Sequence, residues 1–178
     1  MNLVDILPGS QISIAREGET IDAITVAVDA FPDTDPSTNY TNLGTVEQFE
    51  PTKSETVIKR RASRDGAAYR TRKTVRTNKE LVWNFTLQEW SELTLVELLL
   101  DSNTPVAGDF VPGDRTDPVR CVLRVENFNT ITGNKILDMF VWAELSVGTY
   151  QFKEGVDPYA LQVEVLDSEL NSGIVTNL

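Results

Sequence analysis

Short stretches in which apolar and polar residues alternate restrict the fold of this 178-residue chain more than any other feature. In 80–87 every odd position is apolar, and every even position except Val82 is polar. Successive side chains of a strand point to opposite faces, so this stretch predicts a strand with one buried and one solvated face. The stretches 119–125 and 137–145 alternate in a similar way, and Gly133 supplies the turn expected between them.

Other stretches rich in apolar and β-branched residues predict further strands at 21–28, 43–50 and 159–165, with another beginning at Thr56. One helix is expected at about 88–101, packed on a sheet, because apolar residues recur there at spacings of three and four. These residues are Trp90, Leu93, Val96, Leu99 and Leu100. No strand–helix–strand repeat is visible, which argues against a parallel sheet.

The expected fold is therefore mainly β: an antiparallel β-sandwich or open barrel with one flanking α-helix. The length favours a single domain over residues 1–178, with short N-terminal and C-terminal arms. The segment 61–79, which contains Gly66 and many charges, is expected to be a long basic loop.

Charge is distributed very unevenly along the chain. Residues 53–79 hold ten Lys and Arg residues and two acids, a net charge of +8, whereas the remaining six cations and 25 acids give −19. A basic segment on an acidic body is consistent with binding to nucleic acid, with docking on the acidic surface of a second copy, or with a solvated loop. Against nucleic acid, Tyr69 is the segment's only aromatic residue for stacking on bases.

The sequence lacks the residues and motifs on which most enzyme mechanisms depend. The chain has no histidine and a single cysteine, Cys121, which is expected to be a small core residue rather than a reactive thiol. The phosphate-binding, dinucleotide-binding and nucleophile-elbow motifs are all missing. The acidic pairs Asp33/Asp35 and Asp114/Asp117 are interpreted as solvated loop charge, because their spacing is not that of an EF-hand. We therefore expect no enzyme activity, no cofactor and no metal.

Nothing in the sequence suggests export or a membrane location. The first eight residues have no basic region and are interrupted by Asp5, so no signal peptide is expected. The longest apolar run, Leu98–Leu100, is far shorter than the roughly 20 residues that span a bilayer.

A resemblance to a known family begins at 42–51, where Leu43-Gly44 leads through a probable strand to Glu50-Pro51. It continues with the acidic-then-basic strand 55–60 and with the block Thr86–Glu89 before the helix-like stretch 93–100. In this order the segments resemble the tail tube (major tail) proteins of long-tailed bacteriophages, over roughly residues 40–165.

The resemblance implies rings of six subunits that stack into a tube, with one sheet of each subunit contributing to a barrel around the lumen. It implies as partners the tape-measure protein, the tail terminator and tip proteins, and double-stranded DNA in passage. The particle would be assembled in the host cytoplasm and end as the tail of a virion. A related secretion-system tube protein, or a nucleic-acid-binding module that uses 53–79, remains the alternative.

Two sets of residues are candidates for this function. The first is an inter-ring contact in the basic segment, formed by Arg60, Arg61, Arg64, Arg70, Arg72, Lys73 and Arg76. The second is a lumen wall whose carboxylates repel DNA, formed by Glu80, Asn84, Thr86, Asp138 and Glu144.

Overall fold

In the computed structural model the described residues are 8–32, 39–63, 69–129, 131–151 and 158–176; for Pro8, 59–63, 69–76 and 78 the description covers the backbone alone. The larger sheet consists of β1 (Pro8–Arg16), β4 (Thr41–Ser63), β5 (Tyr69–Leu87), β6 (Val119–Asn129), β7 (Lys135–Val147), β8 (Tyr159–Val165) and β9 (Ser172–Val175). The short strands β2 (Thr20–Ile21) and β3 (Ile24–Thr25) form a separate pair, and a single π-helix, η1 (Leu93–Leu99), precedes β6 among the described residues.

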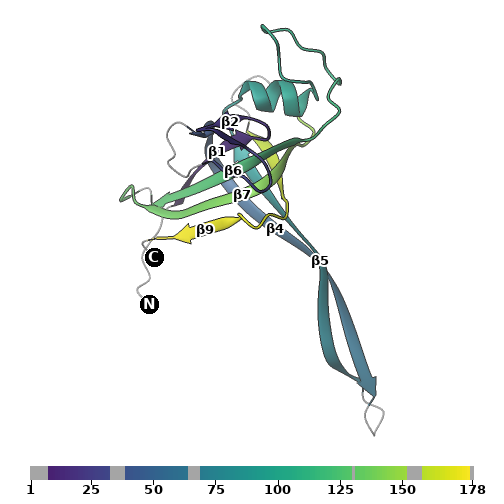
Figure 1. Ribbon diagram of the computed structural model, residues 1–178. Helices are drawn as coiled ribbons and strands as arrows, with labels where there is room; N and C mark the ends of the chain where they lie inside the picture. Colours follow the sequence, from purple (N-terminus) through teal and green to yellow (C-terminus); the bar gives the residue numbers. More distant parts are fainter. Residues whose placement is uncertain (1–7, 33–38, 64–68, 130, 152–157, 177–178) are drawn as a thin grey trace.

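The larger sheet closes on itself. Its order is β6-β1-β4-β5-β8-β7-β9, every pairing is antiparallel, and β6 also pairs with β7. Six strands thus form a barrel, and β9 is an extra strand beside β7 (Figure 1). The mainly β, antiparallel class expected from the alternating stretches is confirmed.

The barrel interior is the main core. It takes the apolar face of each alternating stretch, including Trp83, Phe85 and Leu87 of β5, all buried as expected. Cys121 is fully buried in the same core, and burial raises the pKa of its thiol far above the usual value. Its expected role as a small core residue is confirmed.

A second apolar cluster lies outside the barrel, on the outer face of β1, β6 and β7. Phe140 and Trp142 project outward from β7 and are covered by the chain between β1 and β4. Phe31 stacks on Trp142 at 6.5 Å between ring centroids, and Tyr40 packs on Phe140 at 5.9 Å. This side of the barrel is therefore sealed by the protein itself.

The expected basic loop at 61–79 is wrong. Its described residues belong to β4 and β5, which pair with each other from Val46↔Leu87 as far as Ser63↔Tyr69. Beyond about Ser54 and Glu80 the two strands leave the barrel as a projecting hairpin, here called the arm (54–80) (Figure 1). The Gly66 turn lies outside the described residues. Charge and length suggested a loop because the arm extends beyond the barrel core, which imposes an apolar period on the rest of the two strands.

Three further expectations need correction. The helix is shorter than 88–101 and is a π-helix at Leu93–Leu99, because Ser91 and Thr94 exchange hydrogen bonds at its start and hold the chain before it outside the helix. The strand expected at 21–28 is interrupted by a turn with positive φ at Asp22 and Ala23. The stretch Pro8–Arg16, for which no strand was predicted, is a full barrel strand.

Candidate functional site

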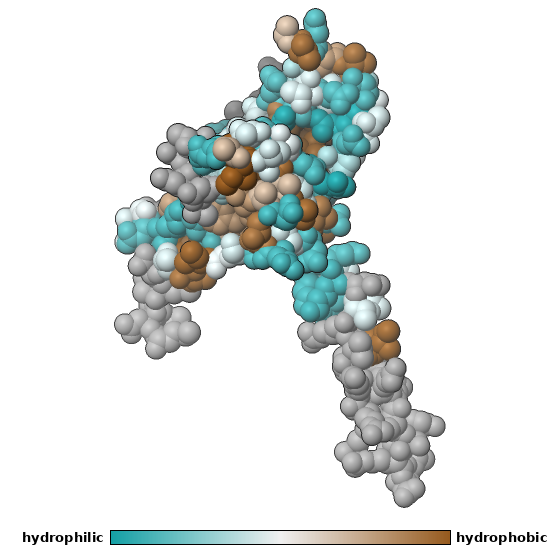
Figure 2. Space-filling model, in the orientation of Figure 1, coloured by the Kyte–Doolittle hydropathy of each residue, from teal (hydrophilic) through white to brown (hydrophobic). Residues whose placement is uncertain are grey.

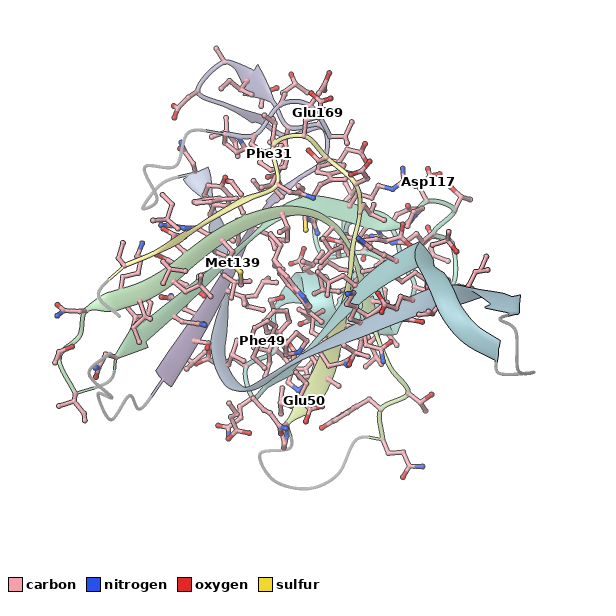
Figure 3. All side chains as sticks on the ribbon, turned by 90° about the horizontal axis from the view of Figure 1, so that it is seen from below. Phe31, Phe49, Glu50, Asp117, Met139 and Glu169 are labelled. Carbon is pink, nitrogen blue, oxygen red and sulfur yellow. The ribbon has the colours of Figure 1, made fainter. Side chains whose placement is uncertain are left out.

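The outer face of β4, β5, β8 and the end of β7 is uncovered and polar; it is called the polar wall. Cross-strand pairing aligns its side chains into rows, for example Glu50–Asn84–Gln162–Ser146. Figure 3 shows Phe49 and Glu50 as neighbours on β4; Phe49 packs on the core, whereas Glu50 is exposed. The wall comprises Gln48, Glu50, Thr52, Val82, Asn84, Thr86, Glu144, Ser146, Ala160, Gln162 and Glu164.

The polar wall carries negative charge and little apolar surface. Glu50, Glu144 and Glu164 supply three carboxylates, and Glu80 adds a fourth where β5 enters the arm. Arg120 of β6 is the cross-strand partner of Glu144 of β7 and forms an ion pair with it at 3.6 Å. An exposed, flat and acidic sheet face repels a polyanion such as DNA and offers it no aromatic surface for stacking.

Four of the five residues proposed for a lumen wall lie on or beside this surface. Asn84 and Thr86 are within it, Glu80 continues it towards the arm, and Glu144 forms its far edge. Asp138 lies elsewhere, on the stretch of β7 that pairs with β9 and leads to Phe140. That any of these residues faces a lumen stays a prediction.

Asp138 belongs to an ion-pair cluster that alternation alone did not reveal. Arg124, only 2% exposed, donates from Nε and Nη2 to the two Asp138 oxygens at 3.0 and 2.8 Å. Lys135 Nζ lies 2.8 Å from Asp138 and 2.6 Å from Glu126. The Arg124 guanidinium also lies 5.2 Å from the centroid of the Phe140 ring.

Arg124 and Lys135 balance the negative charge of the Asp138 carboxylate, which stays ionised. Burial alone raises the pKa of Asp138, but the hydrogen bonds and charges of Arg124 and Lys135 outweigh burial and place that pKa below its usual value. The cluster joins β6 to β7 beside the second apolar cluster. Its role is therefore structural, and Asp138 presents no free charge to a passing polyanion.

The arm carries most of the residues proposed for an inter-ring contact. The backbone positions of Arg60, Arg61, Arg70, Arg72, Lys73 and Arg76 lie on its two strands, whereas Arg64 lies outside the described residues. Arg60 is the direct cross-strand partner of Lys73.

Both strands of the arm also have unpaired edges. β1 pairs with β4 only up to Val46, and β8 pairs with β5 only from Leu81 onward. Within the described residues, the arm beyond these points is hydrogen-bonded only to itself. A two-stranded hairpin with free edges is marginally stable in water and can accept another chain.

Comparisons with known proteins give matches among solved structures only. The fold is similar to a chain in the six-fold symmetrised cryo-EM structure of the anti-feeding prophage (AFP) baseplate, with a TM-score of 0.40 and 9% sequence identity over 100% of this chain and 99% of that chain. No protein-family model and no curated protein matches the sequence. A likeness at this level does not assign a function.

The described residues include neither a membrane-spanning helix nor a cluster of metal ligands. No helix among them has the length and hydropathy needed to cross a membrane. No group of three or more Cys, Asp or Glu side chains among them is placed to hold a metal ion.

Proposed function

We propose that this protein is a structural subunit of a phage tail tube and has no enzymatic role. Six copies would form a ring, rings would stack through the arms, and the polar walls would line a lumen through which DNA passes. Its partners would then be further copies of itself, the tape-measure protein and the proteins at the two ends of the tail.

The observation that carries the proposal is the arm itself. It continues β4 and β5 beyond the barrel for about ten residues on each strand, about 30 Å at the rise of an extended chain. It leaves the acidic barrel while its own segment carries a charge of +8. A projection of this length and charge has a favourable partner in the acidic surface of another copy, and one sequence then supplies both sides of the contact.

Ring closure has a physical cause in the free strand edges. Among the residues that the structure describes, β9 pairs only with β7, and β4 beyond Val46 pairs only with β5. Unpaired backbone groups gain hydrogen bonds when a neighbouring subunit adds a strand. A closed ring pairs such edges between neighbouring subunits and leaves the polar wall uncovered.

The division of the outer surface agrees with a lumen on one side. The face of β1, β6 and β7 is already sealed by the second apolar cluster, whereas the polar wall has no cover from the described chain. The exposed carboxylates of Glu50 and Glu164 would keep DNA from adhering during passage.

Assembly can be tested on the purified protein by negative-stain electron microscopy over a concentration series. Rings and stacked tubes are expected for the wild type. A variant in which a short Gly-Ser turn replaces 62–76 should keep its barrel, seen by an unchanged circular-dichroism spectrum and unfolding midpoint, but should not stack. Protein that stays monomeric in sedimentation at every concentration, or a deletion variant that stacks like the wild type, would contradict the proposal.

The lumen assignment has its own test in assembled tubes. Wild-type tubes should not retain double-stranded DNA, whereas E50K/E164K tubes should retain it in a salt-dependent manner. As a matched control, E169K tubes should retain little DNA, because Glu169 is exposed but follows β8 and lies outside the polar wall. Equal retention of DNA by the E50K/E164K tubes and the Glu169 control tubes would mean that the polar wall does not line the lumen.

Two other functions predict different results. A nucleic-acid-binding module that uses 53–79 would shift a DNA fragment as a monomer at low salt, with a slope set by the number of phosphates neutralised. A secretion-system tube protein would form rings and tubes without any virion component. A tape-measure gene beside the coding sequence favours the phage tail over the secretion system.

A further inference from the structure

The loop between η1 and β6, residues 101–118, forms a projecting knob at the end of the barrel opposite the arm (Figure 1). Its tip is a tight turn in which Val106 and Asp109 exchange two backbone hydrogen bonds of 3.0 Å. The two central residues, Ala107 and Gly108, have φ values of 53° and 89°. Ala107 in the left-handed region costs about 1 kcal/mol, and strain of this kind is common where a surface must have a fixed shape.

The base of the knob is held by buried charge. Glu97 of η1 is almost fully buried and accepts hydrogen bonds from Arg16 of β1 and Arg115 of the knob. Arg115 Nε also donates to the Ser102 carbonyl at 2.9 Å, and Asp114 accepts from the Asn103 backbone N–H at 2.8 Å. The knob is therefore fixed to both the helix and the barrel, even though it projects.

The fixed knob presents apolar side chains to solvent. Val106 is 77% exposed, Phe110 42% and Val111 61%. Figure 2 shows hydrophobic surface gathered at the top of the molecule, over this loop. Exposing a rigid apolar tip is unfavourable unless another surface covers it.

The surroundings of the tip are acidic. The knob contains Asp101, Asp109, Asp114 and Asp117, and its one cation, Arg115, is already paired with Glu97. The net charge that it presents is opposite to that of the basic segment 53–79.

We infer that the knob of one subunit packs against the basic arm of a subunit in the neighbouring ring. The inference rests on the proposed function and names the surface that receives the arm. Phe110 and Val111 would cover apolar side chains of the arm, and the surrounding aspartates would lie among its cations.

Three observations identify the arm of a second copy as the occupant. The arm has exposed apolar side chains at Val57 and Ile58, 41% and 51% exposed, and Figure 2 shows a hydrophobic patch on its described part. Its charge complements that of the knob. Because knob and arm lie at opposite ends of one molecule, they meet when copies repeat head to tail, which is the geometry of an open stack.

A disulfide cross-link tests the contact directly. F110C and I58C would be prepared separately, mixed during assembly and oxidised, with Cys121 buried and unreactive. The mixture should give covalent dimers, several-fold more than either variant alone. I131C, whose parent side chain is 67% exposed at the β6–β7 turn away from the knob, is the matched control and should not cross-link to I58C.

A second experiment measures the energy of the contact. F110S/V111S should raise the protein concentration needed for tube growth by at least about tenfold, since an aromatic anchor at an interface has an effect of this size. The unfolding midpoint should stay unchanged because both side chains are exposed.

The outcomes separate the two proposals. Tubes that form normally in F110S/V111S, with no cross-link between positions 110 and 58, would overturn the knob contact and leave the tube assignment standing. Wild-type protein that forms neither rings nor tubes would overturn the proposed function, and the knob contact with it.

Discussion

The barrel and the arm share two strands but follow opposite physical rules. In the barrel each strand pairs on both sides, and β5 buries Trp83, Phe85 and Leu87 in a closed core. In the arm the same strand pairs on one side only, and Arg60 lies opposite Lys73. The barrel therefore contributes the stability of the subunit, whereas the arm gains stability only when another molecule supplies a partner.

The largest expected effect compares a core substitution with one on the arm. Phe85→Ala removes a fully buried ring that stacks on Phe49 at 4.8 Å, and it should lower the free energy of unfolding by about 3–5 kcal/mol. Ile58→Ala on the arm should lower it by less than about 0.5 kcal/mol. Urea denaturation of the unassembled protein measures both. Similar losses for the two variants would remove the distinction between barrel and arm.

A smaller effect, dependent on pH, is expected at the Asp138 cluster of the barrel. Asp138→Asn should cost about 1–3 kcal/mol at pH 7, because it removes one of the two carboxylates paired with the buried Arg124 and leaves only Glu126. The pKa of Asp138 is lower in the folded than in the unfolded protein, so its contribution is complete above the unfolded value of about 3.9. It is lost as the pH falls through the lower, folded value.

Urea denaturation of wild type and Asp138→Asn at pH 7 and pH 3 checks the sign. The difference between the two proteins should be smaller at pH 3. A difference that grows on acidification would show that the ion pairs do not stabilise the barrel.

Gly44 tests how strongly the barrel constrains its own backbone. It sits at a β-bulge opposite Ile12 with φ of 118°, and a Cβ there would also meet the Glu89 side chain. Gly44→Ala should therefore cost about 1–2 kcal/mol in thermal unfolding. Gly148→Ala is the matched control, because its Cβ would enter open space, and it should be close to neutral. Equal effects at the two glycines would show that the bulge imposes no constraint.

The smallest effect is expected on the polar wall. Glu164→Gln should change the free energy of unfolding by less than about 0.5 kcal/mol, since this exposed side chain has no structural role in the subunit. A loss above about 1 kcal/mol in urea denaturation would make the wall part of the subunit's own stability.

Alternation predicted the barrel strands well because a one-residue change of register would turn Phe85 or Trp83 out of the core. The same principle explains why the arm was wrongly predicted to be a loop. The arm lies beyond the barrel core, so neither the charge nor the composition of 61–79 distinguished a hairpin from a loop. Strand Pro8–Arg16 was missed although Ile12 and Ile14 alternate with polar neighbours, because this alternating stretch is short and its pairings with β4 and β6 are long-range.

The candidate site was only partly predictable. Asn84 and Thr86 were placed correctly opposite the apolar positions of their strand, which local period alone determines. The pairing of Asp138 with Arg124 and the cover over Phe140 were not predictable, because they depend on residues distant in sequence. The position of Arg124 between two apolar neighbours, Leu123 and Val125, was the one available hint.

Hydrogen–deuterium exchange of the arm tests the central claim most directly. In unassembled protein, amides of peptides from 54–63 and 69–79 should exchange much faster than those of β6 and β7. In rings and tubes the arm amides should slow to rates near those of the barrel, while β6 and β7 change little. An arm that exchanges equally fast before and after assembly would contradict the account.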